Sequence, residues 1–119
     1  SIYRSGFYGS NYRYATEAEP EKLFTWSPLV NEAGYHHVYA RWPQGSNFAT
    51  NAKYRVHHQS PQDGTELVTE VSMNQTTNGN QWRDLGLYWF NGGIQSIDLS
   101  NLNANGTVVA DAIMLVPQL

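Results

Sequence analysis

Cysteine is absent from this 119-residue chain, and charged residues are scarce. Without cysteine the protein forms neither disulfide bonds nor thiolate metal sites, although exported proteins can also lack this residue. Charged residues make up 14% of the sequence, compared with about 25% in ordinary soluble domains. The net charge of -3 offers no basic surface to DNA or RNA, so we expect no nucleic-acid partner.

Long apolar runs and helical periodicity are also missing. The longest apolar runs, such as residues 85–90, are far shorter than the roughly 18 residues of a membrane-spanning helix. A helical turn is suggested only over Thr16–Lys22, where Pro20 interrupts it. We therefore predict an all-β protein with no membrane span. Its length suits one core and not two, which predicts a single domain over residues 1–119.

Short segments rich in Val, Tyr, Trp and Thr alternate with clusters of Gly, Pro and Asn, as in sandwiches and barrels. The predicted strands are Phe24–Ser27, Tyr35–Trp42, Lys53–Gln59, Glu66–Met73, Leu85–Phe90, Gln95–Leu99 and Thr107–Val116. Short connections between them favour an antiparallel two-sheet β-sandwich of the jelly-roll type. The aromatic segment before Phe24 is expected to lie across this sandwich as an ordered flap.

The alternation of side chains along each strand assigns them to faces of the sheets. In the 53–59 strand, Tyr54, Val56 and His58 are predicted to point inward. In the 35–42 strand both faces carry bulky groups, which predicts a central strand covered on both sides. Asp111 lies within the apolar last strand, so we expect it to be a buried, hydrogen-bonded structural residue.

Catalytic and metal-binding patterns are weak. The four histidines form two adjacent pairs, so at most one of each pair could join Asp111 at a metal, and structural roles are favoured, as for His58. A glycosidase would need two positioned carboxylates, whereas Asp84 and Asp98 lie at strand edges with nothing local to position them. No serine lies in a G-x-S-x-G setting. We predict no catalytic residue, no metal site and no cofactor.

Asparagine and aromatic residues together indicate a different chemistry. Aromatic faces stack on the C–H patches of sugars, and amides form paired hydrogen bonds with neighbouring hydroxyls. The predicted carbohydrate platform consists of Trp82 and Tyr88, with Asn51, Asn80 and Arg83 at its rim. Two alternatives stay open: Trp82 plugs the end of the sandwich, and the asparagines cap turns. The excess of arginine over lysine makes an acidic polysaccharide one candidate ligand.

Six ordered stretches of the sequence carry a family resemblance. They are Tyr8–Arg13, Phe24–Pro28, Gly34–Tyr35 with Val38–Pro43, Ala49–Ala52 with Tyr54–His58, Asn74–Gln75 with Gly79–Trp82 and Leu85–Gly86, and Ala104–Gly106 with Val108–Ala112. With them the chain resembles the golvesin C-terminal-like domain, also described as the xanthan-lyase carbohydrate-binding-like module.

The resemblance implies a non-catalytic, galactose-binding-like β-sandwich attached to secreted bacterial hydrolases, lyases or amidases. Its implied role is to bind a polysaccharide and tether a covalently attached catalytic domain to it, outside the cell. Two other classes of function remain open at this point. One is a structural spacer or adhesion module with no sugar ligand, and the other is a small hydrolase. Fold alone does not decide among them.

Overall fold

The computed structural model describes residues 3–6, 13–16 and 20–119. These residues form an all-β protein whose named strands pair antiparallel. None of the described residues lies in a helix, so this part of the chain offers no helix that could cross a membrane. The prediction of an all-β, antiparallel fold is therefore confirmed.

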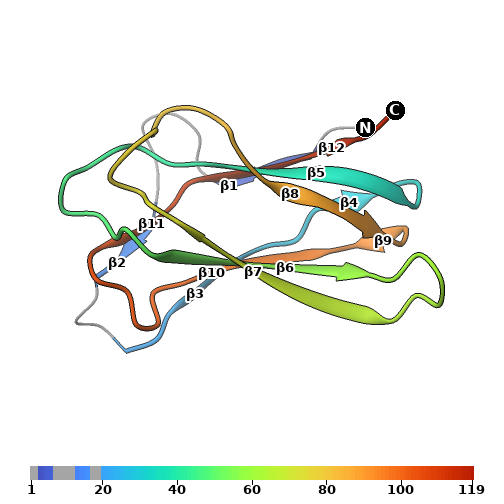
Figure 1. Ribbon diagram of the computed structural model, residues 1–119, viewed down its shortest axis with the longest axis horizontal. Coiled ribbons are helices and arrows are strands. Elements are labelled where there is room, and N and C mark those ends of the chain that lie inside the picture. The colour runs from blue at the N-terminus through green and yellow to red at the C-terminus, as the bar shows by residue number, and fades with distance from the viewer. Residues whose placement is uncertain (1–2, 7–12, 17–19) are drawn as a thin grey trace.

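Two four-stranded sheets dominate the structure, and Figure 1 shows them as separate layers. The first has the order β1 (Tyr3–Gly6), β12 (Ala112–Pro117), β5 (Gly34–Arg41), β8 (Arg83–Phe90). The second has the order β3 (Leu23–Trp26), β10 (Ser96–Ser100), β6 (Ala52–Gln59), β7 (Glu66–Met73). Two small sheets pair β11 (Val108–Ala110) with β2 (Arg13–Ala15) and β4 (Leu29–Val30) with β9 (Gly93–Ile94).

The hydrophobic core lies where the two large sheets face each other. Alternate residues of β3, β5 and β6 are buried there, which is the pattern expected of a sheet with one covered face. The buried side chains include Phe24, Trp26, Val38, Ala40, Tyr54, Val56, Ile97, Leu99, Ile113 and Leu115. At roughly 1.5–3 kcal/mol for each large apolar side chain, this burial is the main force that holds the layers together.

The alternation along β6 is confirmed, since Tyr54 and Val56 are buried while Lys53 and Arg55 are half-buried. Strand β5 is central, as predicted, because it pairs with β12 on one side and β8 on the other. Its second face is not fully covered, however, since Tyr35 is 46% exposed. The prediction of two covered faces was therefore wrong in this respect.

The amino-terminal segment differs from the predicted flap. Residues 3–6 form the edge strand β1 against β12, and residues 13–15 form β2 against β11. Backbone pairing thus adds them to sheets. Residues 1–2, 7–12 and 17–19 of the expected flap lie outside the described residues, and residues 17–19 are also part of the suggested helical turn.

The predicted last strand is two strands in the structure. The chain leaves β11 at Ala110, passes Asp111, which belongs to neither strand, and enters β12 at Ala112. Because β11 pairs with β2 whereas β12 pairs with β1 and β5, the chain changes sheets at Asp111. Apolar periodicity continues through this point, so the break is invisible in the sequence.

Candidate functional site

Three loops meet at one end of the molecule, the end opposite β9 and the carboxyl terminus in Figure 1. They comprise residues 43–51, 74–82 and 101–107. The Asn80 amide donates to the Trp42 carbonyl over 2.7 Å, and the Ala49 amide donates to the Thr107 carbonyl over 2.7 Å. The Asn-rich loops that suggested sugar recognition are therefore tied together by backbone hydrogen bonds.

Within the 78–83 segment, the structure places two of the predicted rim residues and the predicted platform tryptophan. Asn80 is exposed, while Trp82 and Arg83 are half-buried at the start of β8. Asn78 and Asn80 have φ values of 56° and 60°, a left-handed conformation that asparagine tolerates better than most residues. Asn80 thus serves a turn through its backbone and still presents its side chain to solvent.

Asn51 has a different environment from the rest of the predicted rim. Its Nδ2 donates to the Asn103 carbonyl over 3.0 Å, and its Oδ1 accepts from the Asn105 amide over 3.0 Å. Asn105 in turn accepts from the Thr50 amide over 2.9 Å. These bonds direct the Asn51 amide toward the 101–107 loop and not toward the 78–83 segment.

Tyr88, the second predicted platform residue, lies on the core side of β8. It lies directly opposite the buried His36 of the neighbouring strand β5. The centroid of its ring lies 4.8 Å from that of His58 on the opposite sheet. Its hydroxyl donates to the Leu85 carbonyl over 2.6 Å. Burial, and then the charge of Asp84, raise the pKa of the Tyr88 hydroxyl. Tyr88 therefore fills the gap between the sheets and is only half-buried there.

His58 lies inside the fold as predicted, although only half-buried. Its Nε2 lies 2.8 Å from the Thr69 hydroxyl, and its ring contacts Tyr88. Burial lowers the pKa of the His58 ring, because the charged form is poorly solvated there. These contacts are those of a packing residue, and its structural role remains a prediction.

Asp111 is buried as expected, with 3% of its surface exposed, but the hydrogen bonding differs from the prediction. Its Oδ1 has no hydrogen-bond partner among the described residues. Burial raises the pKa of this carboxyl to about 6, and the nearby positive charge of Arg41 offsets only part of that effect. The expectation that buried donors satisfy this carboxylate was therefore wrong for Oδ1, because Asp111 occupies the corner where the chain changes sheets.

The other two carboxylates considered for catalysis have well-defined partners, contrary to the prediction. Asp98 accepts from the Thr25 hydroxyl over 2.9 Å and lies 2.8 Å from Nε2 of His57. The Oδ1 of Asp84 accepts from the Gly86 amide over 2.8 Å. Alternation places Asp98 on the outer face of the β3–β10–β6–β7 sheet, whereas Asp84 lies on the outer face of the other sheet. The two carboxylates therefore do not face each other as a glycosidase pair would.

A row of partly exposed side chains on the outer face of β5 and β8 was missed as a candidate site. We call it the outer stripe; its members are Tyr35, His37, Tyr39, Asp84, Leu87 and Trp89. They form three directly opposed cross-strand pairs, Tyr35 with Trp89, His37 with Leu87 and Tyr39 with Asp84. The signal in the sequence is the bulky second face of residues 35–42, which we predicted to be covered.

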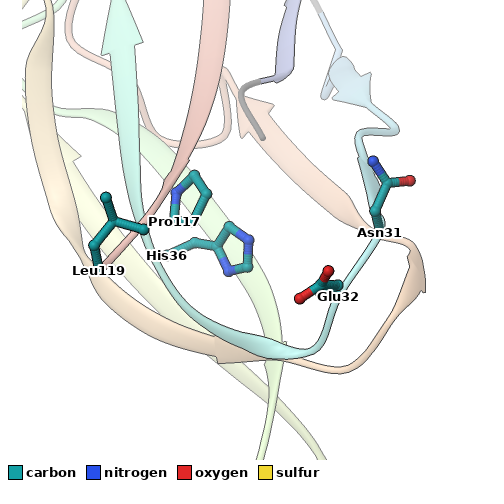
Figure 2. Close-up of a pocket in the computed structure, with 5 residues that line it drawn as sticks. All are labelled: Asn31, Glu32, His36, Pro117 and Leu119. Carbon is teal, nitrogen blue, oxygen red and sulfur yellow. The ribbon is translucent and has the colours of Figure 1, made fainter.

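A pocket of about 270 Å³ lies at the other end of the molecule. It is lined by Asn31, Glu32, His36, Pro117 and Leu119. Figure 2 shows the His36 ring between Pro117 and Leu119 on one side and Glu32 on the other. The His36 Nδ1 lies 3.0 Å from the carbonyl of Gly34, so the first residue of β5 orients this ring.

The histidines, aspartates and glutamates do not gather into a set of three that could hold a metal ion, in the part of the chain that the structure describes. His36 lies beside the pocket, His37 on the outer stripe, His57 beside Asp98 and His58 beside Tyr88. The adjacent histidines of each pair therefore point to different environments, as alternation requires.

Comparison with known proteins agrees with this architecture. The chain is 33% identical over 114 residues to a xanthan lyase of Bacillus sp. (strain GL1), an alignment that covers 92% of this chain and 12% of that enzyme. The structure of a Paenibacillus xanthan lyase contains a similar fold, with a TM-score of 0.82 and 30% sequence identity over 99% of this chain. The matched segment is 12% of that chain, so this protein corresponds to a small part of each enzyme. Residues 1–117 match the model of the golvesin C-terminal domain, and the chain therefore belongs to the golvesin C-terminal domain family.

Proposed function

We propose that this chain is a single, non-catalytic polysaccharide-binding module that tethers a secreted bacterial enzyme to its polymer. The observation that carries the proposal is the match of nearly the whole chain to one segment of xanthan lyases, enzymes named for their action on a polysaccharide. The two facing four-stranded sheets are consistent with a jelly-roll, galactose-binding-like sandwich, a fold used by many sugar-binding domains. A covalently attached catalytic domain would be its partner.

The 78–83 segment is the proposed contact surface. Trp82 is half-buried, so part of its indole remains available to stack on a pyranose, and the exposed Asn80 amide can bond to hydroxyls. Arg83 adds a planar cation that suits the carboxylate of an acidic sugar. Tyr88 and Asn51 contribute less directly, since the hydroxyl of Tyr88 and the amide of Asn51 already bond to backbone groups.

A spacer or adhesion module with no sugar ligand is the second candidate. The hydrogen bonds between the Asn51 side chain and the backbone of the 101–107 loop favour this candidate, because they make Asn51 a turn cap. A small hydrolase has less support, since Asp84 and Asp98 lie on the outer faces of different sheets.

Affinity electrophoresis tests the proposal. The parent and Trp82→Ala would be run through gels containing xanthan, alginate, chitosan or peptidoglycan fragments, with Leu102→Ala as a control at an exposed position of the same end. We expect retardation of the parent with a dissociation constant between tens of micromolar and millimolar, or about 4–6 kcal/mol of binding. Trp82→Ala should be retarded less than the parent, and Leu102→Ala should behave like the parent. Free migration of the parent in every gel would favour the spacer.

A further inference from the structure

We propose that the outer stripe is a second sugar-binding site and that it takes a neutral pyranose segment of a polysaccharide. The inference rests on the proposed function, but it concerns a different surface from the 78–83 segment. Three features carry it: ordered and partly exposed aromatic rings, a carboxylate fixed beside them, and an extent that suits an oligosaccharide and not a protein.

The aromatic rings of the outer stripe are held in place while part of their surface stays open. Tyr35 is 46% exposed and meets Trp89 edge to face, with the ring centroids 5.3 Å apart. The Trp89 indole N–H donates to Oδ1 of Asn91 over 3.3 Å, which fixes the tilt of its ring. An exposed phenol on a fixed indole offers an ordered apolar face to sugar C–H groups, with little conformational entropy left to lose on binding.

A β-bulge sets the carboxylate at the other end of the outer stripe. The register between β5 and β8 shifts between Val38 and Tyr39, and on β8 Gly86 adopts a φ of 125°. The Gly86 amide donates to Oδ1 of Asp84 over 2.8 Å. Bulges commonly re-aim side chains beside functional sites. Here the bulge fixes one oxygen of Asp84 and leaves the side chain 48% exposed.

His37 completes the polar end of the outer stripe. Its Nδ1 lies 3.3 Å from Oδ2 of Asp84, which is within ion-pair distance, although the angles are not those of a hydrogen bond. Its ring stacks on Tyr39 with the centroids 5.9 Å apart. A carboxylate oriented in this way can accept hydrogen bonds from sugar hydroxyls next to the aromatic surface.

Charge selects the kind of sugar. Asp84 would repel a uronic acid or a pyruvylated sugar placed against it, since like charges in contact are unfavourable. Arg83 pairs with the buried Ala40 and so points to the opposite face of the strand from Asp84. Arg41 shares the outer face of β5, but it is paired with Ala112 of β12, and its positive charge acts on the neighbouring Asp111. The outer stripe therefore fits a neutral pyranose, whereas the 78–83 segment with Arg83 can take an acidic one.

The dimensions favour a sugar over a protein partner. Two strands about 5 Å apart, over a rise of about 3.3 Å per residue, give the outer stripe an area on the order of 100–200 Å². A stable protein interface needs about 800 Å² on each partner, and its centre is depleted of charged residues such as aspartate. A shallow strip with a carboxylate beside aromatic rings is instead suited to a short run of pyranose units.

Affinity electrophoresis and NMR on the full 119-residue chain test this inference. The gels would contain a neutral polymer, hydroxyethyl cellulose or guar galactomannan, or an acidic one, xanthan or alginate. The variants are Tyr35→Ala and Asp84→Asn in the outer stripe, Trp82→Ala in the 78–83 segment, and Val68→Ala as a control on the exposed outer face of β7. Thermal melting of each variant verifies that it is folded.

We expect the neutral gels to retard the parent, Trp82→Ala and Val68→Ala to the same degree. The dissociation constant of Tyr35→Ala in these gels should be about five- to tenfold higher than that of the parent. Asp84→Asn should weaken binding in the same gels. In a ¹⁵N-labelled parent, the neutral polymer should shift the Trp89 indole signal and leave those of the buried Trp26 and Trp42 in place.

Three results would overturn the inference. If the neutral gels retard the parent, Tyr35→Ala and Asp84→Asn equally, the outer stripe is not the site and the proposed function still stands. If only the acidic gels retard the parent, the neutral ligand is wrong while polysaccharide binding stands. Free migration of the parent in all gels, with no shift of the Trp89 indole, would reject both the inference and the proposed function for these polymers.

Discussion

The side chain of Gln75 forms a two-way hydrogen-bonded pair with the backbone of Val109. Its Nε2 donates to the Val109 carbonyl over 2.8 Å, and its Oε1 accepts from the Val109 amide over 2.9 Å. The same Nε2 lies 3.3 Å from the hydroxyl of Tyr54. Gln75 is fully buried, so one amide satisfies a stretch of strand backbone in the interior and ties the 74–82 loop to β11.

Replacing Gln75 by alanine should therefore destabilise the protein. The change leaves the buried amide and carbonyl of Val109 without partners, at about 1–3 kcal/mol for each. We expect a loss of roughly 2–4 kcal/mol in the free energy of unfolding, measured by urea titration. Gln81→Ala, at an exposed position of the same loop, is the matched control and should change stability by less than about 0.5 kcal/mol. Equal stability of the two variants would contradict the prediction.

The stability of the protein should depend on pH through Asp111. Its pKa is raised to about 6 in the folded protein, above the roughly 3.9 of an unfolded aspartate. Between these values the folded state binds more protons, so this group makes the protein more stable as pH falls from about 6 to 4. Above pH 6 Asp111 is ionised in the folded protein, and burial of its charge lowers the free energy of unfolding. Asp111→Asn removes this charge and therefore the loss of stability.

Urea unfolding of the parent and Asp111→Asn at pH 4.5 and 7.5 measures this effect. The stability of Asp111→Asn relative to the parent should be higher at pH 7.5 than at pH 4.5, by on the order of 2 kcal/mol. Burial lowers the pKa of His58, which acts in the opposite direction below about pH 6.5. Both proteins contain His58, so its effect cancels in the difference. A difference that is independent of pH would show that Asp111 titrates normally.

Gly86→Ala should disturb the bulge of β8. Its φ of 125° is strained for an L-residue, and an added Cβ would lie 2.7 Å from the Tyr88 hydroxyl. We expect a loss of about 2–3 kcal/mol, from backbone strain of order 1–3 kcal/mol and from displacement of the tyrosine. Gly93 has a φ of 115°, and no atom lies within 4 Å of an added Cβ. Gly93→Ala therefore introduces backbone strain without a close contact, and it should lower the free energy of unfolding by less than Gly86→Ala does. Gly86→Ala should cost less stability in a Tyr88→Ala background, which lacks the whole ring, than in the parent, and an equal cost in the two backgrounds would assign the loss to strain alone.

Trp82→Ala should cost less stability than truncation of a core tryptophan. Trp42 is 1% exposed, and its replacement by alanine is expected to cost about 3–5 kcal/mol. Trp82 is half-buried, so we expect a cost below about 2 kcal/mol, measured by thermal or urea unfolding of both variants. A loss as large as that of Trp42→Ala would show that Trp82 is a plug of the fold.

The fold class and the faces of its strands could be predicted from the sequence. Alternation in the 53–59 segment identified Tyr54 and Val56 as core residues, because the side-chain period of a strand is a local property. The breaker clusters marked the turns for the same reason, and Asn78 and Asn80 have the positive φ values that such residues tolerate.

The partners of each side chain could not be predicted, because they depend on which distant strands pair and in which register. Asp111 lies in an unbroken apolar pattern, yet β11 and β12 belong to different sheets, and this change leaves its Oδ1 unpartnered among the described residues. Asp84 looked unsupported, yet the bulge opposite Val38 brings the Gly86 amide and His37 to it. Asn51 was predicted to contact a ligand, but in the structure its side-chain amide donates to the Asn103 carbonyl of the 101–107 loop. The amino-acid pattern determines which face of a strand is apolar, whereas contacts between residues far apart in the chain determine which polar groups find partners and which remain free to bind a ligand.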